Sequence, residues 1–266
     1  MPELPEVEVV KQSLDKKIKF QKINQVLVRN RNLRFNIPKN FEFYLKDKKI
    51  NQISRRSKYL ILHLNNNAFL IVHLGMSGTI HLVKKNNYRN TNTSFYGFSD
   101  LPTKHNHIVI FFKNYQFIFN DPRRFGFVKI LKNEKKLNFF FNKIGPEPLS
   151  SNFKISYIYK YLSGKKKCIK SFLIDQKFVS GIGNIYASEI LFYSKVNPSK
   201  QANKITRLEM KKIKYFSKFV LNLAIKKGGS SIRDFKNIKG KSGNYQNEFK
   251  VYNRENLDCL DKLCHG

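Results

Sequence analysis

The first half of the chain contains a series of short apolar runs that polar turns separate, with no helical pattern between them. Each run is rich in the β-branched and aromatic residues that strands prefer. Such strand signals dominate up to about residue 131, and examples are Tyr59–Leu64, Phe69–Leu74, His107–Phe112, Gln116–Phe119 and Gly126–Leu131. Their connections, such as Asn65–Asn67, are short enough for hairpins, whereas parallel strands need long crossovers. This region therefore predicts an antiparallel sandwich or barrel rather than a parallel sheet.

Helical patterns stand on both sides of these strands. Apolar residues recur at helical spacing from Glu6 to about Ile18, and a second helical region follows Gly145–Pro148, which has the composition of a domain boundary. Further helices are expected at Ile155–Leu162, Cys168–Asp175, Asn184–Ser194 and Thr206–Lys227. The sequence thus predicts an α+β protein with a β-rich N-terminal part and a helical C-terminal part.

The last of these helices has the clearest limits. Thr206 and Glu209 have the spacing of a capping box, and Gly228-Gly229 ends the helix. Its apolar stripe is interpreted as core rather than as a partner site. The stripe consists of Leu208, Ile213, Phe216, Val220 and Leu223.

The chain carries 51 Lys and Arg residues against 18 Asp and Glu residues, a formal charge of +33. A positive field of this kind favours a polyanionic partner, and nucleic acid is the partner it indicates. An AT-rich genome explains part of the excess, because Lys, Asn, Ile, Phe and Tyr are abundant and Trp is absent. The sign of the charge, rather than its size, therefore supports a nucleic-acid partner.

No segment resembles a secretion signal or a membrane span. The N-terminus is acidic where a signal peptide is basic and apolar, and no apolar run approaches the ~20 residues of a membrane helix. Three cysteines provide no framework of paired disulfides. We therefore expect a reduced, cytoplasmic protein without a membrane partner.

The first residues, Met1-Pro2-Glu3, offer a nucleophile. Removal of Met1 would free Pro2 as a secondary amine, and α-amino groups titrate near pH ~8, so part of the amine would be unprotonated. Such an amine can attack C1′ of a sugar and form a charged iminium, and Glu3 could supply the proton that opens the sugar ring. An ordinary helix start, with proline and acidic residues in its first turn, explains the same residues.

Three later segments have features of nucleic-acid contact. Arg55–Lys58 places basic groups before a strand, where a sheet edge can meet a phosphate, although a solvated charge run is the alternative. Met76 projects from a glycine-flanked turn, which suits an apolar wedge between base pairs. Asp121–Gly126 begins like a type I turn and presents Arg123 and Phe125 together, a pair able to replace an extruded base.

A fourth segment, Asp175–Ala187, connects two predicted helices through a glycine-containing turn. Glycine before a helix N-terminus lets backbone N–H groups approach a phosphate closely. Glycines that serve only packing are the alternative.

The segments occur in a recognisable order. Between Met1 and Phe235 the chain contains MPELPEVE, RRSKYL, HLGMSG, DPRRFG, GPEPL, GIGNIYASE and GGSSIRDF. It closely resembles the formamidopyrimidine-DNA glycosylase family, the bacterial base-excision enzymes for 8-oxoguanine and ring-opened purines. Leu4 stands where the related endonuclease eight proteins have glycine, which favours the oxidised-purine branch.

The resemblance implies three domains: an N-terminal catalytic β-sandwich over residues 1–135, a helix–two-turns–helix DNA-binding domain over 136–240 and a zinc-finger remnant over 241–266. It implies a monomeric, bifunctional DNA glycosylase and AP lyase that needs no cofactor for its chemistry. The enzyme would flip an oxidised purine out of duplex DNA, remove it through a Schiff base on Pro2 and cleave the AP site by β- or β,δ-elimination.

The resemblance also assigns roles to single residues. Pro2 would be the nucleophile, Glu3 the general acid, and Glu6 would help to order the active site. Lys58 would contact the phosphate beside the lesion and assist base release. Other DNA contacts would come from His105, Arg123, Lys166 and Asn184, and the wedge would consist of Met76, Arg123 and Phe125. The loop over the flipped base would include Gly228, Gly229, Ser230, Ser231, Ile232 and Arg233.

The C-terminus departs from the family pattern. Family members usually end in a zinc finger with two C-x-x-C pairs, a strong tetrahedral signature. Cys259 stands at the first ligand position, but Lys262 occupies the second and Cys264 comes two residues late. We therefore expect no structural zinc. In the family, the hairpin of this zinc finger also carries an arginine that assists δ-elimination, and no residue here matches it. We therefore expect δ-elimination to be impaired.

Two other functions remain open. A DNA-binding relic of the same family, without catalysis, would keep the fold, but intact Pro2, Glu3 and Lys58 argue against it. A basic RNA- or ribosome-associated protein would explain the charge and none of the ordered motifs.

Overall fold

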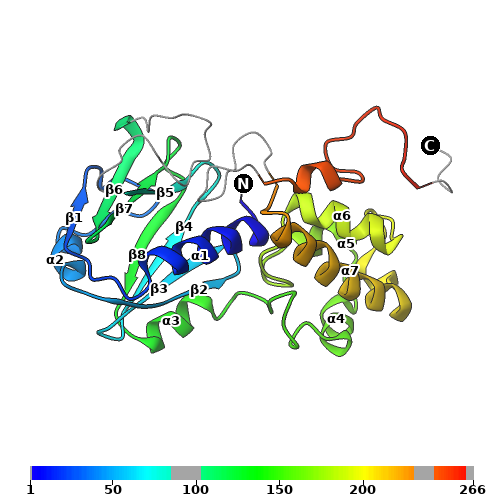
Figure 1. Cartoon of the computed structure of the whole chain (residues 1–266). Coiled ribbons are helices and arrows are strands. Elements are labelled where there is room, and N and C mark those ends of the chain that lie inside the picture. Colours follow the sequence, from blue (N-terminus) through cyan, green and yellow to red (C-terminus); the bar gives the residue numbers. More distant parts are fainter. Residues whose placement is uncertain (1, 85–102, 231–242, 262–266) are drawn as a thin grey trace. The chain divides into compact units, whose positions relative to one another are not determined.

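The structure, a computed structural model, describes residues 2–84, 103–230 and 243–261, and it divides into two compact units (Figure 1). The first unit comprises Met1–Asn142 and Gly228–Gly243, and the second comprises Lys143–Lys227 and Asn244–Gly266. This division differs from the expected boundaries at 135/136 and 240/241. Helix α3 (Glu134–Phe141) packs on the first unit through Leu137 and Phe140, and Ser230 hydrogen-bonds to Glu6 of the same unit.

Eight strands of the described residues form two antiparallel four-stranded sheets in the first unit. One sheet has the order β1-β6-β7-β5, made of Gln25–Val28, Asn106–Phe111, Tyr115–Asn120 and Thr79–Lys84. The other has the order β2-β3-β4-β8, made of Ile50–Arg56, Tyr59–Leu64, Phe69–His73 and Phe127–Leu131. The predicted α+β class and its β-sandwich are confirmed. Strands β1, β2 and β5 lie in the region of predicted strands but are not among the runs named from the sequence.

Alternate residues of the two sheets share one core. Leu60 and Leu62 of β3 belong to the same cluster of buried side chains as Phe117 and Phe119 of β7. Ile61, on the opposite face of β3, belongs to a separate cluster against which α3 packs. Side chains that alternate between faces thus give each sheet one side in the common core, which makes the pair a sandwich.

Two further helices of the first unit add apolar residues to this core. Helix α1 (Leu4–Ile18) contributes residues at helical spacing, as its pattern predicted, and the short helix α2 (Phe41–Leu45) contributes Phe41 and Leu45. Helix α1 begins two residues before the predicted Glu6, because Leu4 and Pro5 form its first turn, where proline is tolerated.

The second unit is helical, as predicted. Its helices lie within one residue of the predicted limits at each end: α4 (Ile155–Leu162), α5 (Ile169–Ile174), α6 (Asn184–Ser194) and α7 (Arg207–Lys226). The predicted capping box is present, since the Thr206 side chain accepts from the Glu209 backbone N–H and the Glu209 carboxylate accepts from the Thr206 N–H. Short 3₁₀ segments occupy Thr103–His105, Ala202–Lys204 and Tyr245–Glu248.

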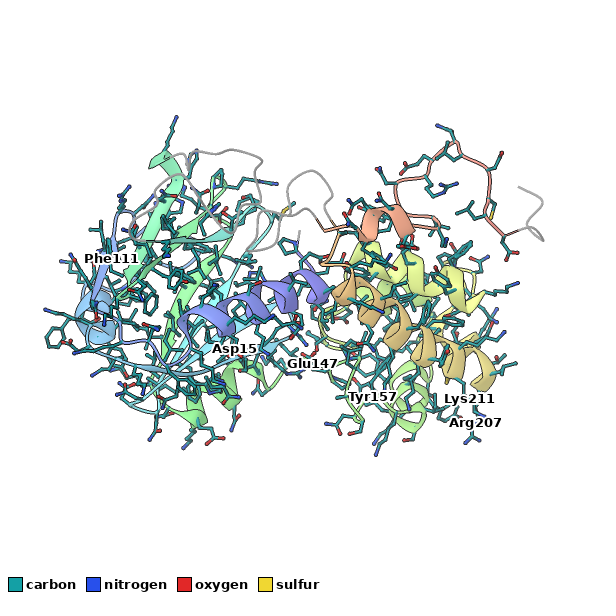
Figure 2. All side chains as sticks on the ribbon, in the orientation of Figure 1. Asp15, Phe111, Glu147, Tyr157, Arg207 and Lys211 are labelled. Carbon is teal, nitrogen blue, oxygen red and sulfur yellow. The ribbon has the colours of Figure 1, made fainter. Side chains whose placement is uncertain are left out.

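The predicted stripe of α7 is only partly buried. Ile213 and Val220 are buried, but Phe216 and Leu223 are half-buried. Leu208 is 63% exposed, whereas Met210 is buried. Leu208 lies two residues before Met210, about 200° round the helix, and so faces away from the core. Arg207 and Lys211 also extend from the exposed side of this helix (Figure 2). None of the described helices has both the length and the apolarity that a bilayer span requires.

Candidate active site and nucleic-acid interface

Two buried carboxylates lie at the start of α1. Glu3 is the N-cap residue and is 3% exposed, as is Glu6 in the first turn. The Glu3 backbone N–H donates to Glu6 Oε2 at 2.9 Å, and the Glu3 side chain in turn accepts from the Glu6 backbone, which completes a capping box. The other oxygen of Glu6, Oε1, accepts from the backbone N–H of Ser230 at 2.9 Å and from its hydroxyl at 3.1 Å. Glu6 therefore ties the N-terminus to a segment more than two hundred residues away.

Lys58 brings a buried cation to these carboxylates. It lies in the tight turn between β2 and β3 and is 5% exposed. Burial lowers the pKa of the Lys58 ammonium below its usual value, while the carboxylates of Glu3 and Glu6 oppose this shift. A cation out of water is costly unless it is paired, so the carboxylates and the ammonium stabilise one another as a group. Pro2, half-buried, directly precedes Glu3.

This arrangement places three kinds of reactive group at one end of α1. A freed Pro2 amine would be a nucleophile, Glu3 a proton donor or acceptor, and Lys58 a cation for an incoming phosphate. The structure thus brings together the four residues assigned to catalysis from the resemblance, and their roles stay proposals.

The predicted wedge is built around a buried aspartate. Asp121 is fully buried, and its Oδ1 accepts from the Ser77 hydroxyl at 2.5 Å and from the Arg123 N–H at 3.3 Å. Its Oδ2 accepts from the Gly126 N–H at 2.7 Å. One carboxylate therefore holds the turn that bears Met76 and the turn that bears Arg123.

Glycine lets these two turns touch. Gly75 has φ +62°, and a β-carbon there would lie 2.5 Å from both the Gly126 nitrogen and the Phe125 carbonyl carbon. Met76 and Phe125 project from the joined turns, 48% and 45% exposed, and the Arg123 guanidinium lies 4.6 Å from the centre of the Phe125 ring. Large exposed apolar side chains fixed by a rigid base are what an intercalating wedge requires.

A cavity of about 700 Å³ opens beside these side chains. Its lining consists of Asn32, Leu33, Arg34, His73, Gly75, Met76, Arg123, Arg124 and Phe125. His73 was not predicted as a site residue. Its Nδ1 accepts from the Gly75 N–H at 3.1 Å, and its ring stacks on Phe127 at 5.4 Å, so it fixes the turn before Met76.

The burial of His73 leads us to expect a lower free energy of unfolding in acid. Burial, followed by the charges of Arg34 and Lys58, lowers the pKa of His73 from 6.5 to about 4. The unfolded chain therefore binds the proton of His73 more tightly than the folded protein does. The free energy of unfolding is unaffected by this proton above pH 6.5 and falls as the pH drops toward 4, by about 2 kcal/mol at pH 5. Urea unfolding at pH 8 and pH 5 is expected to show this loss in the wild type and not in His73→Asn, whose amide oxygen can still accept from Gly75. An equal loss in both proteins would contradict it.

The predicted phosphate site lies at the start of α6. Gly181 has φ +85°, and Gln176 holds the turn by accepting from the Gly181 N–H at 2.7 Å and donating to the carbonyls of Ile174 and Ile182, both at 2.8 Å. Asn184 is the first residue of α6 and is exposed. A glycine turn that leads into a helix N-terminus is an arrangement that can bind an anion, as the sequence predicted, and this role of Asn184 stays a prediction.

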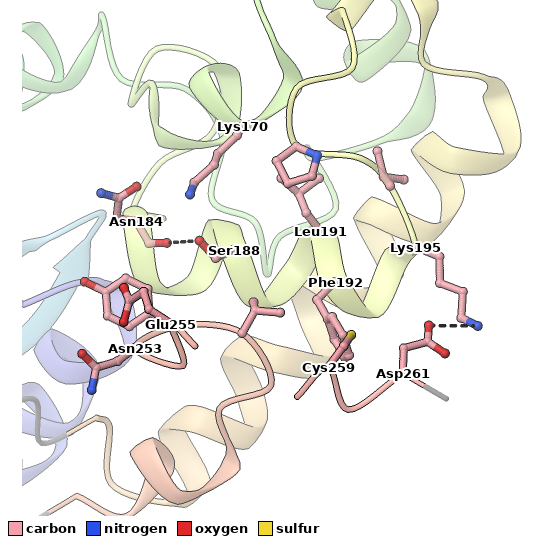
Figure 3. Close-up of a pocket in the computed structure, with 14 residues that line it drawn as sticks. Lys170, Asn184, Ser188, Leu191, Phe192, Lys195, Asn253, Glu255, Cys259 and Asp261 are labelled. Carbon is pink, nitrogen blue, oxygen red and sulfur yellow. Dashed lines mark hydrogen bonds and ion pairs between the residues drawn. The ribbon is translucent and has the colours of Figure 1, made fainter. Parts of the chain in front are cut away.

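Asn184 borders a second cavity, of about 690 Å³ (Figure 3). Lys170 of α5 lies on the same lining and its side chain reaches into this space near Asn184 (Figure 3). The predicted contact Lys166 is exposed but is not part of this lining. Lys170 was not predicted as a site residue, although a basic residue shortly before the glycine turn is a signal that could have found it.

Glu189 anchors the other wall of this cavity. It is fully buried on α6, and its carboxylate accepts from the backbone N–H groups of Lys250, Val251 and Tyr252 at 2.9, 3.1 and 2.9 Å. Val251 and Tyr252 line the cavity. One buried carboxylate thus fixes the segment that leads to the C-terminal cysteines.

The remaining predicted residues have less context. His105 is half-buried in a 3₁₀ turn, and its carbonyl accepts from the Asp121 N–H at 3.1 Å. Gly228 and Gly229 have φ of +84° and +82°. Cys259 is exposed, and the described residues contain no group of three or more His, Cys, Asp or Glu side chains able to hold a metal. Among the residues predicted for the site, Ser231, Ile232, Arg233 and Cys264 lie outside the described part of the chain.

Family models match both units of the chain. The model described as the formamidopyrimidine-DNA glycosylase N-terminal domain matches residues 1–128, and the one described as the formamidopyrimidine-DNA glycosylase H2TH domain matches residues 144–236. The first match contains the carboxylates, Lys58 and the wedge, and the second contains Asn184 and the glycine turn. The matches define the class: a DNA glycosylase with a β-sandwich domain and a helix–two-turns–helix domain.

Relatives match nearly the whole chain. Formamidopyrimidine-DNA glycosylase of Wolbachia pipientis subsp. Culex pipiens (strain wPip) is 42% identical, covering 100% of this chain and 93% of the relative. That of Legionella pneumophila subsp. pneumophila (strain Philadelphia 1) is 39% identical, with 98% and 90% covered. The solved complex of Lactococcus lactis Fpg with an abasic site containing DNA has a TM-score of 0.86 and 33% identity, covering 98% of this chain and 91% of that one. The chain belongs to the formamidopyrimidine-DNA glycosylase family.

Proposed function

We propose that this protein is a monomeric, cytoplasmic bacterial base-excision enzyme that removes oxidised purines, 8-oxoguanine and formamidopyrimidines, from duplex DNA and then cleaves the AP site. The observation that carries the proposal is the group of three buried charged residues, Glu3, Glu6 and Lys58, at the end of α1 that Pro2 precedes. Related proteins support a DNA substrate, because solved Lactococcus lactis structures contain an abasic site or a N7-benzyl-Fapy-dG in DNA.

The chemistry begins with the extruded nucleotide. Flipping a damaged base out of the stack costs a few kcal/mol, which the wedge of Met76, Arg123 and Phe125 offsets by filling the space left in the helix. The lone pair of the Pro2 amine then bonds to C1′, the glycosidic bond breaks with its electron pair leaving on the base, and the amine proton passes to the departing base. Glu3 then protonates the ring oxygen as the bond between C1′ and this oxygen breaks, and the nitrogen lone pair forms the C1′ iminium.

The same iminium drives strand cleavage. Its positive charge acidifies the proton on C2′, and loss of this proton expels the 3′ phosphate in a β-elimination. Water then hydrolyses the iminium and releases Pro2. Lys58 would hold the phosphate beside the lesion through its ammonium group. Asn184 and Lys170 would bind the DNA backbone from the second unit, where the helix N-terminus also favours an anion.

A nicking assay tests the proposal against its alternative, a DNA-binding relic without catalysis. The enzyme is expected to cleave a duplex with 8-oxoguanine opposite cytosine and to leave the undamaged duplex intact. A relic would bind the lesion duplex and release neither base nor cleaved strand. Binding without any base release would therefore overturn the proposed activity.

The ends left by cleavage test the consequence of the incomplete cysteine set. Because Lys262 stands where the family's finger has its second cysteine, we propose that the finger does not form, that β-elimination therefore dominates and that the chain needs no zinc. Gel analysis of cleaved abasic DNA is expected to show mainly the β-elimination product, with no metal in the purified protein. Mainly 3′-phosphate ends, or one zinc per chain, would contradict this prediction.

A further inference from the structure

Arg55 links helix α1 to the turn that carries Lys58. It lies in β2, two residues before the turn, and its side chain is only 9% exposed. Its Nε donates to Glu8 Oε2 on α1 at 2.9 Å, and its Nη1 donates to the Ser57 carbonyl at 2.8 Å. One rigid guanidinium thus bridges two segments that both contribute to the candidate active site.

The turn itself needs this support. Ser57 is buried and has φ +56°, in the left-handed region where a residue with a β-carbon is strained by about 1–2 kcal/mol. The carbonyl that Arg55 holds belongs to the peptide joining Ser57 to Lys58, so the hydrogen bond fixes the direction in which the Lys58 backbone leaves the turn. A planar donor with two arms can hold this carbonyl and Glu8 at once; an ammonium with one nitrogen cannot do so in the same geometry.

Glu8, the carboxylate that Arg55 binds, fixes the Lys58 turn to helix α1. Glu8 belongs to the same helix as Glu6, and Glu3 caps that helix. A side chain anchored to Glu8 therefore places the Lys58 turn relative to both buried carboxylates, which interact electrostatically with the Lys58 ammonium. Displacement of a catalytic group by about 1 Å can cost about 10²-fold in rate.

We propose that Arg55, together with Glu8, is a positioning pair that sets Lys58 against Glu3 and Glu6 for base release. This inference depends on the proposed function, in which Lys58 assists removal of the damaged base. Arg55 does not touch the substrate in this role; it acts through the turn.

Arg55→Lys tests the pair, because it keeps the charge and removes the two-armed bridge. Single-turnover removal of 8-oxoguanine is expected to fall about tenfold, with cleavage of a preformed AP site reduced less than about threefold. The matched control is Arg31→Lys, since Arg31 also bridges a carboxylate, Glu42, and a carbonyl, that of Pro38, elsewhere in the same unit. The control is expected to keep both rates within about twofold.

A double-mutant cycle separates positioning from general loss of structure. In a Lys58→Met background, Arg55→Lys is expected to have no further effect on base removal, because the group it positions is gone. The same loss in both backgrounds, or no loss in the single variant, would overturn the inference. If the Arg55→Lys protein does not fold, Glu8→Gln weakens the same bridge from α1. Removal of 8-oxoguanine and cleavage of a preformed AP site are then measured on that variant. A wild type that releases no base contradicts the proposed function instead.

Discussion

Pro2→Gly is expected to lower borohydride trapping on lesion DNA, and strand cleavage with it, by about 10²-fold. A secondary amine condenses with the sugar aldehyde to a permanently charged iminium, whereas the primary amine of glycine gives an imine that must first be protonated. Glycine also lacks the pyrrolidine ring that restricts the orientation of the amine, so the amine is less well placed. The measurement is the covalent protein–DNA adduct resolved on a denaturing gel.

Binding serves as the control for this variant. The wedge, Asn184 and Lys170 are unchanged in Pro2→Gly, so affinity for the lesion duplex is expected to stay within about threefold of the wild type. Equal trapping by both proteins would show that another amine forms the covalent bond. Lys58 also brings an amine to the candidate site, and Lys58→Met would then be the variant that loses the adduct.

Glu3→Gln is expected to reduce base removal by about 10²–10⁴-fold, the usual contribution of a general acid. The amide keeps the shape of the side chain and can still accept at the N-cap, and the Glu3 backbone N–H still donates to Glu6. The helix cap is therefore expected to survive the change. Loss of the carboxylate also removes one of the two charges that hold the Lys58 pKa up, so the pKa of Lys58 falls further below its usual value.

The readout for Glu3→Gln is a comparison of two substrates. Cleavage of a preformed AP site should fall less than removal of 8-oxoguanine, because the AP sugar is already free to open. Asp15→Asn is the matched control, a carboxyl-to-amide change near the other end of α1 that should leave both rates unchanged. Unchanged base removal in Glu3→Gln would exclude Glu3 as the general acid.

Elements with a strong local pattern were predictable from the sequence. Helix α7 is marked by its capping box and by two glycines after its end, and β3 by a nearly continuous apolar run between polar turns. Strand β2 was missed because a register shift between Ile50 and Gln52 interrupts its alternation and leaves few of its side chains buried. Strand β5 was missed because Thr79 and His81 are polar although both are buried.

The contacts that organise the site could not be predicted in the same way. The motifs named Glu6, Lys58 and Asn184, but nothing local relates Glu6 to Ser230 or Glu189 to the backbone of residues 250–252. Arg55 and Glu8 are likewise 47 residues apart and read locally as ordinary surface charges. Such pairs depend on how the chain folds back on itself, so they appear only in three dimensions.

The most direct test of the central claim is mass spectrometry of the protein–DNA adduct after borohydride reduction. The wild-type protein is expected to lack Met1 and to carry the reduced sugar on the nitrogen of Pro2. An active protein that retains Met1, or an adduct on a lysine side chain with undiminished strand cleavage, would contradict it.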